Sequence, residues 1–167
     1  SSAYMIFTIA NKFHMDAVFE KSFKNKGIPY NRFSAQPTIF NNILWYAVAE
    51  TETQYHLAYY SLLDKTNTTD NVITVDKNHG LLDMSDKNLN TLTWFSKNYF
   101  NLSKKEEADT YKYTDLRYPM LNPNDPNTSV FNFTLYKNKG EWDILPFAGS
   151  PPTQEDFKVF IKRLKGV

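Results

Sequence analysis

At residues 37–64 the chain reads PTIFNNILWYAVAETETQYHLAYYSLLD. Its first half contains a continuous apolar run, residues 43–49, whose side chains suit a buried, pleated surface. Its second half, residues 55–63, is equally rich in aromatic side chains, and the polar segment between the two suits a hairpin loop. We therefore predict two long adjacent antiparallel strands at the centre of a sheet.

The composition is that of a globular protein of ordinary size. Hydrophobic residues make up 41% of the 167 residues and charged residues 22%, unlike the apolar-poor profile of a disordered chain. The net charge of +1 provides no global field for nucleic acid, and no nucleic-acid partner is predicted. The chain has no cysteine, which excludes disulfides, thiolate nucleophiles and cysteine-based zinc sites. Aromatic residues reach 16%, which fits either a tyrosine- and phenylalanine-packed core or an aromatic cleft for a ligand.

The first 25 residues predict a helix with an almost entirely apolar beginning. From Tyr4 to about Asn25 the apolar residues recur three or four positions apart, and Gly27 and Pro29 end the helix. No apolar stretch in the chain is long enough to span a bilayer. Two explanations of the apolar beginning stay open: burial against the sheet, or a membrane helix that precedes residue 1.

The rest of the chain predicts further strands and helices. Alternating or apolar runs predict strands at residues 72–75, 108–118, 130–136 and 142–147, of which the last two form a second hairpin. Capping residues and apolar stripes predict helices at residues 86–98 and 153–164. The expected fold class is α+β, with an antiparallel β-sheet built from two hairpins and packed against two or three helices. Residues 1–167 are expected to form a single domain.

One group of side chains suits ligand binding. Asp115 and Arg117 are a carboxylate and a guanidinium two residues apart, next to the aromatic residues Tyr113 and Tyr118. Because alternate residues of a strand share a face, the pair is expected to project together and to hold an anionic or planar ligand through bidentate bonds. The alternative is a structural ion pair that fixes this strand against a helix or the first hairpin.

Known catalytic and metal-binding motifs are missing from the sequence. His14, His56 and His79 stand outside the spacings of metal sites, and no glycine-rich phosphate loop or nucleophile elbow occurs. The polar segment at residues 64–71 lacks the central glycine and the closing glutamate of a calcium loop. The residues therefore assign no catalytic group and no metal.

A set of short segments spread over most of the chain matches a known family pattern. These segments are Asn11-Lys12, Pro37-Thr38, Asn41-Asn42, Leu44-Trp45, Tyr59-Tyr60-Ser61, Trp94-Phe95 and Asp115-Leu116-Arg117. In them the chain resembles the C-terminal extramembrane domain of the bacterial membrane-bound metal-dependent hydrolases. The family tends toward Asp-Leu-Arg-Phe-Gly where this chain has Asp-Leu-Arg-Tyr-Pro, so Pro119 stiffens a turn that glycine leaves free.

The resemblance implies an accessory domain for substrate recognition or interdomain contact, attached to a transmembrane region in the bacterial inner membrane. The family's metal-binding residues lie in that membrane region, so none carries over to this chain, and a divalent metal is expected only there. The expected partners are the protein's own transmembrane region and a small-molecule ligand. Two alternatives stay open. One is a stand-alone ligand- or peptide-binding module with an aromatic sheet face and no catalysis, and the other is hydrolysis by this domain through Asp115, Arg117 and a histidine.

Overall fold

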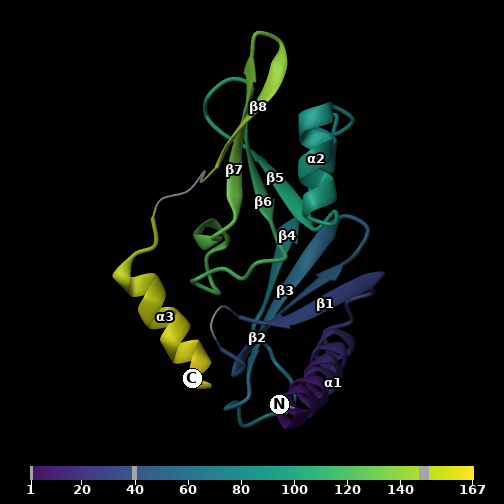
Figure 1. Cartoon of the computed structure of the whole chain (residues 1–167), viewed down its shortest axis with the longest axis vertical. Helices are drawn as coiled ribbons and strands as arrows, with labels where there is room; N and C mark the ends of the chain where they lie inside the picture. Colours follow the sequence, from purple (N-terminus) through teal and green to yellow (C-terminus); the bar gives the residue numbers. More distant parts are fainter. Residues whose placement is uncertain (1, 39–40, 147–150) are drawn as a thin grey trace. The chain divides into compact units, whose positions relative to one another are not determined.

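The structure is a computed structural model that describes residues 2–38, 41–146 and 151–167 (Figure 1). The chain divides into two compact units, one of residues 1–74 and 158–167 and one of residues 75–157. It contains two antiparallel four-stranded sheets together with helices, which confirms the predicted α+β class. The two predicted hairpins belong to different sheets, one hairpin to each.

The elements follow one another along the chain without crossovers inside either sheet. The first sheet has the order β1 (Arg32–Pro37), β2 (Leu44–Glu50), β3 (Gln54–Ser61) and β4 (Val72–Asp76). The second sheet has the order β5 (Phe100–Lys104), β6 (Thr110–Asp115), β7 (Asn132–Asn138) and β8 (Glu141–Pro146). The helices are α1 (Ser2–Asn25), α2 (Lys87–Phe95) and α3 (Gln154–Leu164), with short 3-10 helices η1 (His79–Leu81) and η2 (Pro126–Thr128).

The hairpin predicted from residues 37–64 forms the two central strands of the first sheet. β2 and β3 pair from Leu44 opposite Ser61 to Glu50 opposite Tyr55. The backbone N–H of Thr51 donates to the carbonyl of Gln54 at 2.9 Å and closes the loop. Every residue of β2 before its last is buried, which explains why this strand reads as a continuous apolar run without alternation.

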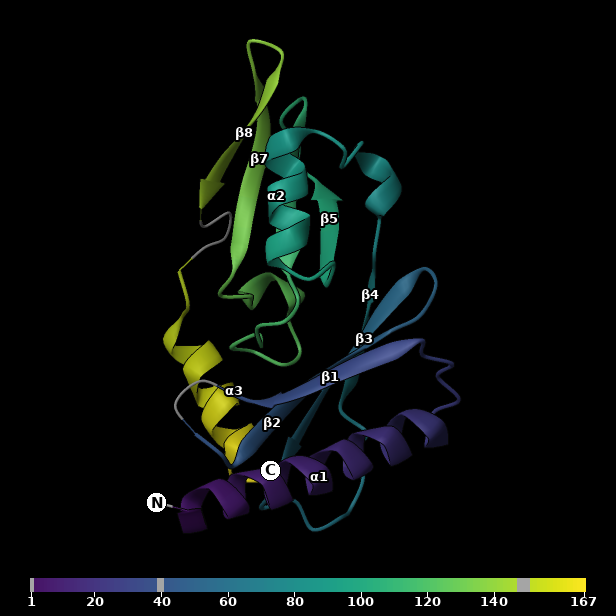
Figure 2. The same cartoon turned by 45° about the vertical axis from the view of Figure 1, so that its right-hand side comes forward.

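Helix α1 packs on the face of the first sheet that carries small side chains (Figure 2). Ala35, Ala47 and Ala58 are direct cross-strand neighbours on β1, β2 and β3 and form a row, here called the alanine row. Phe19 and Phe23 of α1 belong to the same core cluster, and both are fully buried. The small side chains leave room for these rings, so helix and sheet fill the interior together.

Helix α1 ends as the sequence predicts. Gly27 adopts a left-handed conformation with φ of 67°, which glycine tolerates without steric cost. Its N–H donates to the carbonyl of Lys24, and the N–H of Ile28 donates to the carbonyl of Phe23, both at 3.0 Å. This pair of bonds is the Schellman arrangement, which satisfies carbonyls that the helix end would otherwise leave free.

The C-terminal residues are joined to the first sheet by an ion pair. The guanidinium of Arg163 donates to both carboxylate oxygens of Asp64, at 2.7 and 2.5 Å, and to the carbonyl of Tyr59 at 3.0 Å. Both charged side chains are only 12% exposed. A bidentate, mostly buried pair of this kind fixes geometry as well as charge.

In the second unit, α2 covers one face of the sheet. Leu89 and Leu92 of the helix form a core cluster with Leu102, Tyr113 and Leu135 of the strands. The predicted start of this helix is confirmed, because the Asp86 carboxylate accepts from the backbone N–H groups of the second and third helical residues.

One strand of this unit was missed, and the bounds of another need correction. Strand β5 has only five residues and was not among the predicted strands. Strand β6 runs only from Thr110 to Asp115, whereas the alternation predicted a strand over residues 108–118. Arg117 therefore lies in the turn after the strand and does not share a strand face with Asp115. Residue 147, the predicted end of the second hairpin, lies outside the described residues.

Candidate functional site

The second sheet has one apolar face and one polar face. Leu102, Tyr113 and Phe133 are cross-strand neighbours on β5, β6 and β7, and they belong to the core cluster with α2. Because side chains alternate along a strand, the next row projects from the opposite face. That row consists of Ser103, Lys112 and Thr134.

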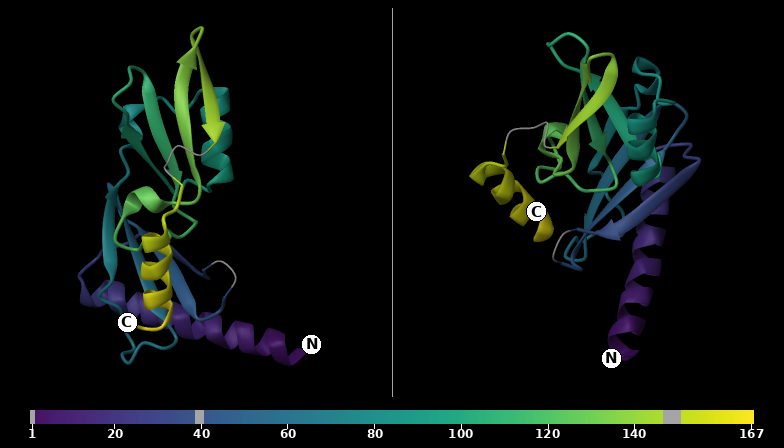
Figure 3. Two further views of the ribbon diagram at one scale, coloured as in Figure 1. Left: turned by 90° about the vertical axis from the view of Figure 1, so that its left-hand side faces the viewer. Right: turned by 45° about the horizontal axis from the view of Figure 1, so that its top comes forward.

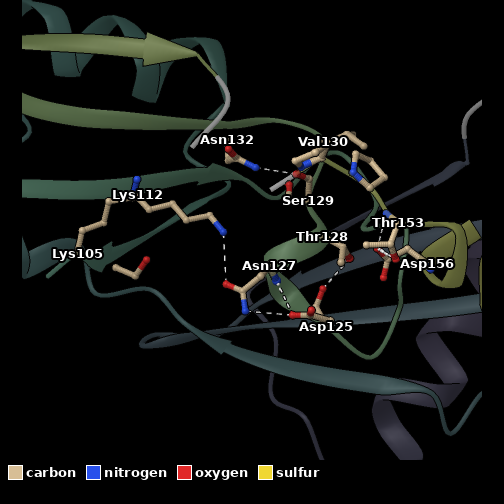
Figure 4. Close-up of a pocket in the computed structure, with 13 residues that line it drawn as sticks. Lys105, Lys112, Asp125, Asn127, Thr128, Ser129, Val130, Asn132, Thr153 and Asp156 are labelled. Carbon is tan, nitrogen blue, oxygen red and sulfur yellow. Dashed lines mark hydrogen bonds between the residues drawn. The ribbon is translucent and has the colours of Figure 1, made fainter. Parts of the chain in front are cut away.

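A cavity of about 940 Å³ opens on this polar face (Figure 4). We call it the polar pocket. Its walls come from the β5 to β7 face, from residues 125–132 and from residues 151–156, all within the second unit. Its volume falls near the upper end of the range of about 300–1,000 Å³ that small-molecule sites occupy. Of its 13 lining residues, 10 carry hydroxyl, amide or charged side chains, and Val130, Pro151 and Pro152 are apolar.

The polar pocket contains two lysines that bond to neutral acceptors. Lys105 Nζ donates to Thr134 Oγ1 at 3.1 Å, and Lys112 Nζ donates weakly to Asn127 Oδ1 at 3.4 Å. Within the described part of the chain, neither ammonium group forms a salt bridge with a carboxylate. Burial lowers the pKa of Lys112 below its ordinary value, repulsion from Lys105 lowers it further, and attraction to Asp125 partly opposes these effects.

The two acids that line the polar pocket cap local structure. Asp125 accepts from the backbone N–H of Asn127 at 2.9 Å and from its side-chain amide at 3.1 Å, at the start of η2. Asp156 accepts from the backbone N–H and the hydroxyl of Thr153, at 2.9 and 2.7 Å, at the start of α3. These bonds lower the pKa of Asp156 and keep its carboxylate charged.

The loop that forms one wall is held in shape by hydrogen bonds. The Thr128 hydroxyl donates to the carbonyls of Asn122 and Asp125 and accepts from the N–H of Asn122 at 2.9 Å. The next residue, Ser129, is only 6% exposed, and its Oγ is buried without a hydrogen-bond partner among the described residues. A buried polar atom that lacks a partner is uncommon in folded proteins and calls for an explanation.

The predicted Asp115 and Arg117 group is a local ion pair at the end of β6. Arg117 Nε donates to Asp115 Oδ1 at 3.0 Å and Nη2 donates to Oδ2 at 2.6 Å, while the backbone N–H of Arg117 also donates to Oδ1 at 3.0 Å. Asp115 is fully buried and the Arg117 side chain is 20% exposed. The bonds to the carboxylate raise the pKa of the Arg117 guanidinium above its ordinary value.

The two tyrosines of this predicted group have different environments. The Arg117 guanidinium lies over the rings of Phe95 and Tyr118, 5.0 and 5.5 Å from their centroids. Tyr118 also stacks on Phe131 at 3.9 Å. Tyr113 is fully buried in the core, where its hydroxyl bonds to Ser96 Oγ. Ligand binding by Asp115, Arg117, Tyr113 and Tyr118 stays a prediction.

The histidines occupy separate elements. His14 lies on α1, His56 on β3 and His79 on η1. His56 Nδ1 lies 3.0 Å from Thr74 Oγ1, and burial lowers the pKa of its imidazole. In the described ranges, no three histidine, aspartate or glutamate side chains are grouped closely enough to hold a metal ion.

Helix α1 carries a second notable surface, before the point where it meets the sheet. Residues 2–10, here called the apolar segment, contain no charged side chain, and their large apolar side chains are mostly exposed. Met5 is 64% exposed, Ile6 68% and Ile9 54%. Both views in Figure 3 show this first half of the helix extending past the strands of its own unit. No described helix has the length and apolarity needed to cross a membrane.

Helix α1 is hydrogen-bonded to the loop before β2 at the end of the apolar segment. Asn11 Nδ2 and Trp45 Nε1 both donate to the carbonyl of Asn42, at 3.4 and 3.1 Å. Asn41 Oδ1 accepts from the backbone N–H groups of Ile43 and Leu44, at 3.0 and 2.7 Å, and shapes the same loop. Residues that carry the family resemblance thus join α1 to the hairpin.

No protein-family model, curated protein or solved structure matches the chain. The resemblance to membrane-bound hydrolases therefore remains a prediction.

Sequence reasoning missed the polar pocket. The signal for it is the polar phase of the predicted strands, in which Lys112, Asn132 and Thr134 alternate with apolar residues. An alternating pattern alone indicates a strand with one solvent-exposed face. The loops that enclose this face are evident only in the folded structure.

Proposed function

We propose that this chain is the extramembrane domain of a membrane-attached protein, and that the apolar segment of α1 lies in the hydrocarbon of the bilayer. One observation carries the proposal: residues 2–10 form a helix without charge whose apolar side chains are exposed. A helix with apolar side chains all round is typical of a protein interior or a membrane. A groove on another protein would instead require a one-sided apolar stripe.

The change of character along α1 supports the same arrangement. Lys12 is the first charged residue, and it forms an ion pair with Asp16 one turn later. Beyond Asn11, the buried apolar residues of α1 belong to the core cluster with the sheet, whereas before it the large apolar residues are exposed. Transfer of one such side chain into an apolar phase is worth about 1.5–3 kcal/mol. The resemblance to membrane-bound metal-dependent hydrolases is consistent with an accessory role beside a membrane region that holds the metal.

Vesicle flotation tests the proposal. The 167-residue chain should float with phosphatidylcholine vesicles, and the double variant Ile6→Glu/Ile9→Glu should remain in the dense fraction. Loss of two buried isoleucines is worth at least about 3 kcal/mol, so partitioning should fall at least about a hundredfold. The far-ultraviolet circular dichroism of the variant should match that of the parent, because neither residue contacts the core.

A matched control separates the apolar segment from surface apolarity in general. Leu63 and Trp94 are 55% and 78% exposed and lie outside α1. The double variant Leu63→Glu/Trp94→Glu should float like the parent. Equal flotation of all three proteins, or failure of the parent to float, would contradict the proposal. A stable dimer without vesicles that the Ile6→Glu/Ile9→Glu change abolishes would show that a second copy covers the segment instead.

A further inference from the structure

We propose that the polar pocket of the second unit binds a small hydroxylated organic anion, with its charged group held by Lys105 and Lys112. This inference is independent of membrane attachment, since every lining residue belongs to residues 75–157. It concerns binding and assigns no reaction.

The two lysines account for the negative charge of the ligand. Both ammonium groups belong to the same cavity, and repulsion from Lys105 lowers the pKa of Lys112. Their present acceptors, on Thr134 and Asn127, are neutral. A carboxylate or phosphate oxygen would exchange these bonds for charge-assisted ones, which are roughly twice as strong as neutral hydrogen bonds.

The two nearby carboxylates, of Asp125 and Asp156, form no salt bridge with the ammonium groups of Lys105 and Lys112 in the described part of the chain. Asp125 Oδ1 and Asp156 Oδ2 already accept local N–H and O–H donors, at the starts of η2 and α3. Figure 4 shows Asp125 beside Asn127, with Lys112 on the other side of that amide. The anionic group of a ligand is therefore expected at the strand face, away from the two capping carboxylates.

The other lining side chains account for the hydroxyl groups of the ligand. The cavity wall contains hydroxyl and amide side chains and no aromatic residue among those described, so it suits a hydrophilic molecule better than a flat apolar one. The buried Ser129 Oγ has no partner in the described chain. A ligand hydroxyl that reached it would satisfy a polar atom that folding leaves unsatisfied.

Titration calorimetry at neutral pH tests the inference with four defined probes. They are glucose 6-phosphate, glucuronate, glucose and inorganic phosphate. At least one of the two sugar anions should bind more tightly than both glucose and inorganic phosphate. The tighter of the two then identifies the charged group as phosphate or carboxylate. Binding of neither sugar anion, or equal binding of glucose, would overturn the proposal.

Variants place the binding in the polar pocket. Lys105→Gln and Lys112→Gln should each weaken binding at least about tenfold, because each removes a charge-assisted bond. Lys87→Gln removes the same charge from α2, outside the pocket, and should leave the affinity unchanged. Unchanged affinity in both pocket variants would overturn the assignment.

The Ser129→Ala variant distinguishes a role of this hydroxyl in ligand binding from a role in the stability of the fold. Its hydroxyl makes no bond within the described chain, so its removal should leave the melting temperature unchanged or higher. Affinity for the sugar anion should nevertheless fall, by about fivefold. A lower melting temperature with unchanged affinity would assign the hydroxyl to the fold and contradict its role in binding.

Discussion

Replacing Phe23 by alanine should lower the free energy of unfolding by about 3–5 kcal/mol, the usual cost of emptying a large aromatic site in a core. Phe23 is fully buried, and its ring packs edge-on against Tyr30 and Phe33 at centroid distances of 5.8 and 6.0 Å. It also stands beside the alanine row, whose short side chains cannot extend to fill the space. Urea denaturation followed by tryptophan fluorescence measures the change, because Trp45 belongs to the same core cluster.

The same helix supplies the control for this substitution. Phe13 is 72% exposed, and Phe13→Ala should change the free energy of unfolding by less than about 0.5 kcal/mol. The two variants delete the same side chain from one helix, so helix propensity cancels in the comparison. Equal losses would mean that α1 does not dock on the sheet as described.

Replacing Asp115 by alanine should lower the free energy of unfolding by about 3 kcal/mol, because it leaves Arg117 without its carboxylate in a mostly buried position. Asp115 is fully buried and accepts three bonds from Arg117. The double variant Asp115→Leu/Arg117→Met should recover part of this loss, since replacing both charges removes the cost of burying one alone. Denaturant unfolding of the single and double variants measures both changes.

An exposed ion pair provides the comparison for the buried one. Glu20 and Lys24 form a pair one helical turn apart with side chains 49% and 68% exposed. Glu20→Ala should cost less than about 0.5 kcal/mol, the usual value of such surface pairs. If Asp115→Ala proved equally mild, the Asp115 carboxylate would have no structural task, and the predicted ligand-binding role would gain support.

Local signals explain why much of the fold was predictable. The α1 helix end depends on Gly27, and the α2 start depends on Asp86, so each boundary is encoded within a few residues. The central hairpin is equally local, because the loop is only three residues long. Its continuous apolar strand could be read directly, since burial of both faces removes the alternation.

Nonlocal pairing explains what the sequence did not predict. Strand β5 follows a sharp reversal at Lys97 and Asn98, which both adopt positive φ without the glycine that usually announces one. The sequence of each hairpin does not indicate which strand edges pair with each other. The same pattern is therefore compatible with one sheet or with two. The polar pocket depends on residues 103, 112 and 134 becoming neighbours across three strands and on loops that close over them.

The unbroken course of α1 has a mechanical consequence. The helix continues from Ser2 to Asn25 without interruption, a length of about 36 Å at about 1.5 Å per residue. Its C-terminal half packs on the sheet through Phe19 and Phe23, and Asn11, near its middle, donates to the carbonyl of Asn42. No break in the helix separates the two halves. A rotation or tilt of residues 2–10 is therefore transmitted by a rigid helix to the first sheet, and the strands of that sheet must rotate with it.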